Sequence, residues 1–465
     1  MEAGSWIPKD ARKSLAVLAV LLVLVLQLSG GLRVAPGGPD TEGYLALRGL
    51  RVPEALAGVG TVGYPILLNL TTMASPTLEV LPYLQVGLHI FGVFCFLAGL
   101  GALGIGGLTA TLICGSLLFS NLALGSSRLI LTDAPASSLA IMAIGHTLVV
   151  VGGRRGVWPW VGLAGATFLA YQIRPAYIFL VPFVPLLGLG LALLALETED
   201  VKARWKTIGV ALVAATFLPF LSFCCLRWII TGQFGLASSS GSMSIGVVGQ
   251  FLDDDLVADL PADLRVLAGR ALIRRQELPD LRVSDAGEMA DRSRIESRHA
   301  ATQLMFVNLM APIQKDSSWL LQFRGKQDNL LSRLSLEIIR RRPRLYLYQV
   351  AKEFRAGLKV CILNHDASLF MLLALGALQV CSVFRGRRPG YGCLPSPSIA
   401  SAAYRSLSVM FLISMTFCVS KLLLVVLILP PVERYLAAAG VFMPSLVAIP
   451  LAVALQSAET WRRNR

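Results

Sequence analysis

The sequence predicts an all-α polytopic membrane protein with about ten transmembrane helices and a cap of interfacial helices on its outer face. Hydrophobic residues make up 55% of the 465-residue chain and charged residues only 15%, and the mean hydropathy is +0.66. Apolar runs of roughly 20 residues, long enough to cross about 30 Å of hydrocarbon, recur along the chain. Helices are the expected spanning elements, because backbone polar groups inside lipid must be paired within their own segment.

Clusters of basic residues orient these spans. They precede the first span, follow the fourth, sixth and eighth, and end the chain. With ten spans, every cluster falls on one side, which the positive-inside rule assigns to the cytoplasm. We therefore expect an integral protein of the plasma (inner) membrane with both termini cytoplasmic. The expected spans are about 14–32, 80–100, 106–124, 135–152, 157–171, 175–196, 207–230, 367–384, 406–429 and 436–456.

This topology divides the chain into three parts. Residues 1–230 form an N-terminal transmembrane bundle whose first outer loop, at 33–79, is the expected catalytic loop; residues 231–366 form an outer-face cap; residues 367–465 hold the C-terminal transmembrane helices. The cap mixes apolar and aromatic residues with cations, as helices at a membrane interface do. Its acidic run, Asp253-Asp254-Asp255, is expected to be a solvated face.

Composition excludes several functional classes. The formal charge of +14 is largely the topogenic signal described above, and the basic residues form no base-reading motif, so no nucleic-acid partner is expected. Eight cysteines and four histidines show neither a C-x-x-C spacing nor a metal-ligand cluster. We therefore expect no metal and no other cofactor.

The most informative stretch is Pro39-Asp40-Thr41-Glu42-Gly43-Tyr44, just after the first span. Carboxylates at the outer mouth of a helical bundle are candidates for chemistry on a substrate that arrives from the lipid. Tyr44, four residues after Asp40, would share its helix face, whereas Glu42 would point largely away. Asp40 also suits a helix N-cap, and the two roles are compatible.

A second carboxylate is expected at the same outer surface. Asp133 stands in Thr132-Asp133-Ala134-Pro135 at the start of the fourth span. A helix cap with proline in the first turn explains it adequately. Its position also permits a catalytic role beside Asp40.

Three cations are candidates for binding a lipid phosphate. Arg174 lies in the outer turn between spans five and six, and Arg434 in the outer turn between spans nine and ten. Headgroup anchoring explains both equally well. Lys421 lies inside span nine, where an ionisable group is costly and is by default a functional candidate, with snorkelling or an internal pair as the alternative.

Five short motifs follow one another along most of the chain: Asp40-x-x-x-Tyr44, Gly63-Tyr64-Pro65, Thr132-Asp133-Ala134-Pro135, Ile173-Arg174-Pro175 and Glu433-Arg434-Tyr435-Leu436. Their order resembles that of the GT-C membrane glycosyltransferases, which include protein O-mannosyltransferases and the lipid A aminoarabinose transferase. Two departures stand out: Thr41 separates two acids that are adjacent in several relatives, and small or apolar residues at 58–62 replace an arginine that many relatives carry.

The resemblance implies an enzyme that moves a sugar from a polyprenyl-phosphate donor to an acceptor hydroxyl of a glycan, lipid or protein at the outer face. It maps the catalytic carboxylates to Asp40 and Asp133. The phosphate-binding cations map to Arg174 and Arg434, and less directly to Lys421. Glu42 and Tyr44 are expected to contact substrate. Direct displacement would invert the anomeric configuration, with Asp40 as base.

Two alternatives stay open. A transporter or lipid flippase would use the same lipid-phosphate site to bind cargo, and its polar residues would run through the bundle to the cytoplasmic side. A surface-polysaccharide ligase or polymerase would keep the lipid-linked donor and differ only in acceptor.

Overall fold

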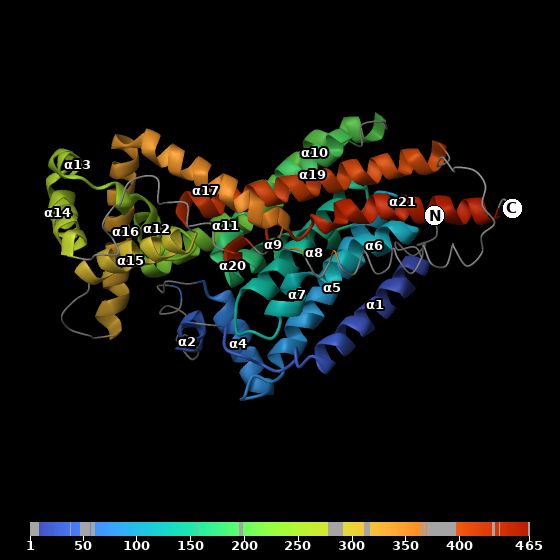
Figure 1. The fold of residues 1–465 in the computed structure, drawn as a ribbon, viewed down its shortest axis with the longest axis horizontal. Helices are drawn as coiled ribbons and strands as arrows, with labels where there is room; N and C mark the ends of the chain where they lie inside the picture. Colours follow the sequence, from blue (N-terminus) through green and yellow to red (C-terminus); the bar gives the residue numbers. More distant parts are fainter. Residues whose placement is uncertain are drawn as a thin grey trace.

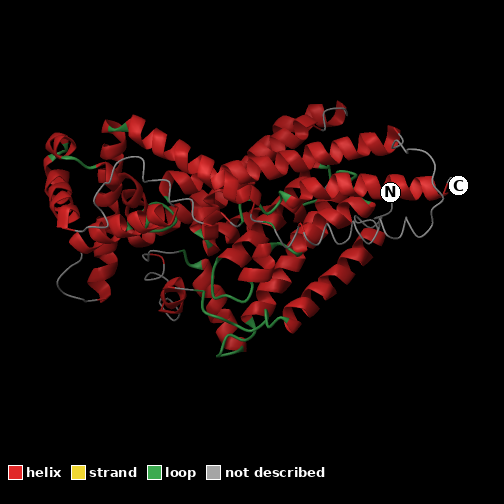
Figure 2. Ribbon diagram, viewed as in Figure 1, coloured by secondary structure: helices red, strands yellow, loops and turns green. Residues whose placement is uncertain are grey.

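The computed structural model is all-α in the part of the chain that it describes (Figures 1 and 2). Extended pairing among those residues is limited to an isolated bridge between Ala35 and Leu129. The structure describes residues 9–37, 39–46, 56, 61–154, 156–194, 199–277, 292–310, 317–363, 365, 369, 397–429, 433–436 and 438–463.

The helices of the first half are α1 (Lys9–Leu28), α2 (Pro39–Ala46), α4 (Gly63–Ala74), α5 (Leu81–Ala102), α6 (Gly107–Leu118), α7 (Asn121–Ser126), α8 (Asp133–Val151), α9 (Trp158–Ile173), the 3-10 helix η1 (Pro175–Phe179), α10 (Leu180–Leu194) and α11 (Glu199–Thr231). The second half holds α12 (Ser240–Val248), η2 (Gly249–Phe251), α13 (Asp254–Asp259), α14 (Ala262–Glu277), α15 (Arg292–Leu309), α16 (Ser317–Arg341), α17 (Pro343–Leu363), α19 (Pro397–Ile428), α20 (Glu433–Leu436) and α21 (Pro444–Arg463).

Seven described helical segments are long and apolar enough to cross a membrane: 10–28, 81–102, 107–126, 133–151, 175–194, 205–231 and 402–428. Each overlaps an expected span, which confirms an integral membrane protein of the all-α class. The expected span at 157–171 is the 16-residue helix α9. The last expected span corresponds to a shorter apolar segment, 444–458. The expected span at 367–384 lies, apart from Leu369, outside the described residues.

Helix α8 lies at the centre of the bundle, with 89% of its apolar window buried. It packs against α5 on one side and α9 on the other. Glycines permit the close approach to α5, because a Cβ at Gly145 would meet the backbone of Cys95 at 2.6 Å and one at Gly99 would meet the carbonyl of Gly145 at 2.5 Å. Small residues of this kind let membrane helices approach backbone to backbone. The close packing holds α8, which begins at Asp133, against α5.

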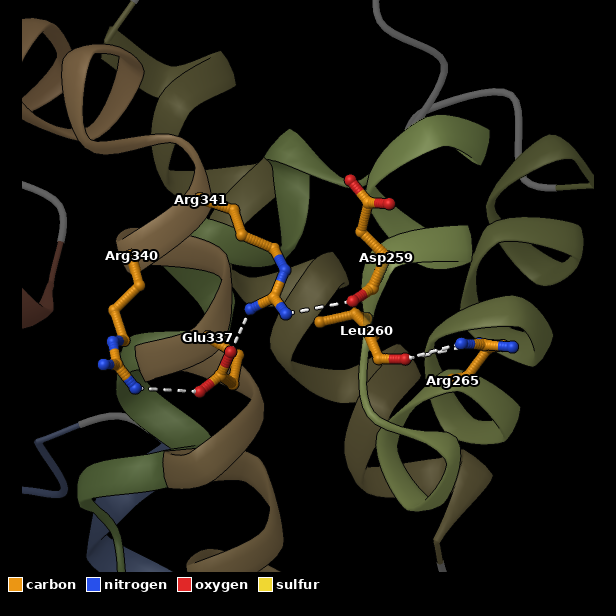
Figure 3. A network of polar contacts seen from close by, with 6 residues as sticks. All are labelled: Asp259, Leu260, Arg265, Glu337, Arg340 and Arg341. Carbon is orange, nitrogen blue, oxygen red and sulfur yellow. Dashed lines mark hydrogen bonds and ion pairs between the residues drawn. The ribbon is translucent and has the colours of Figure 1, made fainter.

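Within the expected cap region, 231–366, helices α12 to α16 form a helical unit with an apolar core of its own, whereas α17 packs mainly with α19 and α20. Buried residues of α12 to α16 make up this core, which is separate from that of the bundle. Polar contacts join its helices at the surface: Arg341 of α16 pairs with Glu337 and donates to the carbonyl of Asp259 at 2.9 Å (Figure 3). The acidic run is exposed, as predicted, and Asp253 also caps α13 by accepting from the backbone of Leu256 at 2.7 Å.

The two ends of the bundle differ in what they carry. The helical unit of α12–α16 extends from one end, and the start of α1 and the end of α21 lie at the other (Figure 1). The contacts described below join the start of α8, the end of α9 and the last turns of α19 near the helical unit. We call this the site end of the bundle.

Candidate functional site

The first loop is held against the segment that precedes α8. The backbone amide of Ala35 donates to Arg128 at 3.0 Å, and that of Ile130 donates to Ala35 at 3.1 Å. Thr41 of α2 is buried; its hydroxyl accepts from the amide of Gly37 at 2.7 Å and donates to the carbonyl of Ile130 at 3.3 Å. Thr41, which separates Asp40 from Glu42, therefore anchors α2 to the bundle.

Asp40 and Tyr44 lie four residues apart on α2, as predicted, with Asp40 in the first turn. Asp40 is exposed, whereas Tyr44 is half-buried and its hydroxyl lies 3.4 Å from the hydroxyl of Thr132. Burial raises the pKa of Tyr44, and the negative charge of Asp40 adds to this effect. Tyr44 is thus a neutral phenol between an exposed carboxylate and the start of α8. Glu42 is exposed, and no described residue is hydrogen-bonded or ion-paired to it.

The centre of the site is a buried ion pair between Asp133 and Arg174. Asp133 opens α8, where the helix dipole favours a carboxylate. Arg174 ends α9 in an extended conformation, which the following Pro175 imposes on the residue before it. Both residues are less than 10% exposed. Arg174 also donates to the hydroxyl of Thr132 at 3.4 Å, so the same hydroxyl lies between Arg174 and Tyr44.

Lys421 reaches this centre from α19. Its ammonium donates to the hydroxyl of Tyr177 at 3.0 Å and lies 4.3 Å from the centroid of that ring. Tyr177 belongs to η1, and its amide donates to the carbonyl of Arg174 at 2.9 Å. Lys421 is only 2% exposed, and no carboxylate among the described residues lies within ion-pairing distance of it. The hydrogen-bond partner of Lys421 is therefore the phenol of Tyr177. An internal ion pair, the alternative considered for Lys421, would need a carboxylate in that place.

The turn that contains Arg434 also reaches the site. Helix α20 includes Arg434, whose side chain lies outside the described residues. The ring of the next residue, Tyr435, lies 5.5 Å from the guanidinium carbon of Arg174, a cation–π arrangement. The motifs that contain Tyr44, Asp133, Arg174 and Tyr435 therefore meet at one place.

Three contributors to the site are not apparent from the candidate residues alone. Tyr64 is fully buried, its ring lies 5.0 Å from that of Tyr44, and its hydroxyl has no hydrogen-bond partner. Gln172 is 2% exposed, and neither polar atom of its amide is hydrogen-bonded. Tyr177 contacts Lys421. Two of these residues could have been identified from the sequence. Tyr64 lies in the Gly-Tyr-Pro motif, and Gln172 is an isolated polar residue in an apolar run just before Arg174.

Gly63 explains how Tyr64 and Gln172 come together. A Cβ at Gly63 would lie 2.6 Å from the carbonyl carbon and oxygen of Gln172. Only glycine permits this approach of the start of α4 to the end of α9 without a shift of the backbone. The motif thus positions Tyr64 beside the residues that lead into Arg174.

The chemistry available at this site is anion binding beside an exposed carboxylate. Arg174 supplies a buried guanidinium paired with the buried carboxylate of Asp133, and Lys421 adds a buried amine that has no carboxylate partner among the described residues. In the part of the chain that the structure describes, no three His, Cys, Asp or Glu side chains are grouped as metal ligands would be. No protein family, curated protein or solved structure matches this chain.

Proposed function

We propose that this integral membrane protein is a glycosyltransferase that moves a sugar from a polyprenyl-phosphate donor to an acceptor hydroxyl at the outer face of the membrane. One observation carries the proposal: motifs spread from Asp40 to Tyr435 meet around two buried cations, Arg174 and Lys421. Their order in the sequence is the one that resembles the GT-C glycosyltransferases. Their convergence is what a common active site requires.

The buried cations suit the phosphate of the donor. A lipid phosphate brings negative charge to the site, which favours the protonated form of Lys421 and gives its ammonium and the Arg174 guanidinium an anion to bind. The cations are held in advance, Arg174 by Asp133 and Lys421 by Tyr177. Cations fixed before the reaction stabilise the charge that develops on the leaving phosphate without reorganising.

Asp40 is the proposed general base. The acceptor oxygen attacks the anomeric carbon of the donor sugar, and the bond from that carbon to the phosphate oxygen breaks. The hydroxyl proton passes to the carboxylate of Asp40, and the electron pair leaves with polyprenyl phosphate. Asp40 meets the requirement of access because it is exposed on α2, beside Tyr44. Single displacement inverts the anomeric configuration.

Asp133 acts as a positioning residue in this scheme. Its carboxylate is buried and paired with Arg174, a geometry that favours holding the cation over contact with the acceptor. Glu42 is exposed on α2 and stays a predicted substrate contact, as does Arg434 of α20.

The distribution of buried ionisable groups favours an enzyme over a transporter. In the described long apolar helices and the turn after α9, the buried Asp, Glu, His, Lys and Arg residues are His89, Asp133, Arg174, Arg227 and Lys421. Each lies at most eight residues from the end of its helix near the site, which is about 12 Å at 1.5 Å per residue. A carrier of polar cargo would extend such groups to the opposite end of the bundle.

The test is a transfer assay with protein reconstituted in lipid nanodiscs. A panel of polyprenyl-phosphate sugars is offered with glycan, lipid and peptide acceptors, and release of polyprenyl phosphate is followed by mass spectrometry. We expect Asp40→Asn to lower turnover at least about 100-fold, the usual contribution of a general base. Glu79→Gln, which alters another exposed carboxylate of the same loop, is the control. Full turnover by Asp40→Asn would refute the base, and the absence of turnover with every donor would refute the reaction.

A further inference from the structure

Two cysteines from different helices meet behind the site. Cys361 lies in the last turn of α17 and Cys418 in α19, two helices that pack together, and both thiols lie close enough to interact within one apolar cluster. Both are buried, at 1% and 0% exposure. The described cysteines are all free thiols in this structure. The reaction proposed above uses neither of these two.

Their surroundings hold the two sulfur atoms in place. Both cysteines belong to one apolar cluster with Leu422, Val425 and Leu436. On the α17 side, the ring of His365 donates to the carbonyl of Cys361 at 2.5 Å. Packed side chains of this kind restrict motion of the thiols, so their proximity is a property of the fold and not of a mobile surface.

The pair joins the helical unit to the site. Helix α17 follows α16 and packs along α19, the helix that carries Lys421 (Figure 1). Cys418 lies three residues before Lys421, on a neighbouring position of the same helix face. The cluster that surrounds the thiols also includes Tyr435, whose ring lies over Arg174. A covalent bond here would fix α17 against α19 beside the cluster that includes Tyr435.

We propose that Cys361 and Cys418 form a disulfide that staples α17 to α19 behind the site. The oxidant is a protein disulfide donor of the thiol–disulfide oxidoreductase class. One cysteine thiolate attacks the donor disulfide and forms a mixed disulfide, which releases one donor thiolate. The second cysteine thiolate attacks the sulfur of the first, forms the new bond and releases the second donor thiolate. The two cysteines lose two protons and two electrons, and the donor gains both.

Burial sets the order of events. Because both thiols are covered in the folded protein, exchange with a protein donor takes place while α17 is docking on α19. Once formed, the bond is shielded from reductants by the same cluster. Formation of this disulfide does not require the proposed transfer reaction.

The test maps thiols in the full-length wild-type chain and in two cysteine variants. Protein from its native membrane is denatured in excess N-ethylmaleimide, digested and analysed by mass spectrometry, with and without prior reduction. Eight cysteines are present. We expect a disulfide-linked peptide pair containing Cys361 and Cys418, with six alkylated cysteines before reduction and eight after it. The linked pair should vanish in Cys418→Ser and persist in Cys225→Ser, which alters an exposed thiol.

Two results would overturn the proposal. Complete alkylation of both cysteines without reduction would show that the pair stays reduced in the membrane where the protein resides. A disulfide from either residue to a different cysteine would show that the contact between them is not the one that is oxidised.

Discussion

Substitution of Asp133 by Asn removes the charge from the centre of the site while nearly preserving its shape. The side chains of Asp133 and Arg174 are 7% and 10% exposed. Removing one member of such a pair costs about 3–5 kcal/mol, because the remaining ion stays buried without its partner. Arg174 keeps its contacts with the hydroxyl of Thr132 and the ring of Tyr435. We therefore expect a loss of about 3 kcal/mol, at the lower end of that range.

A double-mutant cycle isolates the pair from other effects of substitution. The single variants Asp133→Asn and Arg174→Met and the double variant are unfolded reversibly in mixed micelles by titration with SDS. Because the double variant leaves neither ion unpaired, its loss should fall short of the sum of the single losses by about 2–3 kcal/mol. Additivity within about 0.5 kcal/mol would refute the claim that the two side chains act as a buried pair.

Two further predictions concern packing and pH. Gly63→Ala should destabilise the protein by about 1–3 kcal/mol, because the new Cβ meets the backbone of Gln172. Gly165→Ala, where a Cβ meets nothing within 4 Å, is the matched control, and equal melting temperatures of the two variants would contradict the packing. Burial raises the pKa of Glu353 on α17 from 4.5 to about 7. The folded protein thus holds this proton at higher pH than the unfolded chain does, so unfolding free energy should fall between about pH 4.5 and 7, by up to about 3 kcal/mol. Glu353→Gln should flatten this fall in melting curves from pH 4.5 to 8, and an unchanged slope would contradict the assignment.

The transmembrane part of the fold is readable from the sequence because lipid imposes a simple rule. A run of about 20 apolar residues has few alternatives to a spanning helix, so the seven long apolar helices coincide with expected spans. The rule weakens where the run is short. Helix α9 ends at Ile173 because Arg174 precedes a proline and adopts an extended backbone.

The core of the helical unit at α12–α16 was not predictable in the same way. Each of its helices presents a narrow apolar stripe, for example Leu264, Leu267 and Ala271 on α14. Such a stripe fits an interfacial helix as well as a packed one. Which stripes meet is decided by tertiary structure, so the separate core appears only when all the helices are placed together.

The sequence named several residues of the candidate site but not the contacts between them. Motif order and spacing pointed to Asp40, Tyr44 and Arg174, and the first two lie on α2 at the expected spacing. Contacts between residues far apart in the sequence cannot be inferred from local patterns. Lys421, for example, donates a hydrogen bond to Tyr177, which is 244 positions away in the sequence. The anchoring role of Thr41 depends on a backbone carbonyl 89 positions away, which no local pattern reveals.

The proposed function requires Arg174 and Lys421 to form a lipid-phosphate site, and native mass spectrometry of the purified protein can detect the bound lipid. We predict a bound polyprenyl phosphate on the wild-type protein that is lost in Lys421→Met, which removes a buried cation without leaving a carboxylate unpaired. Lys206→Met, which alters an exposed cation, should retain the lipid. Wild-type protein that carries other membrane lipids but no polyprenyl phosphate, or equal retention by Lys421→Met, would contradict the claim.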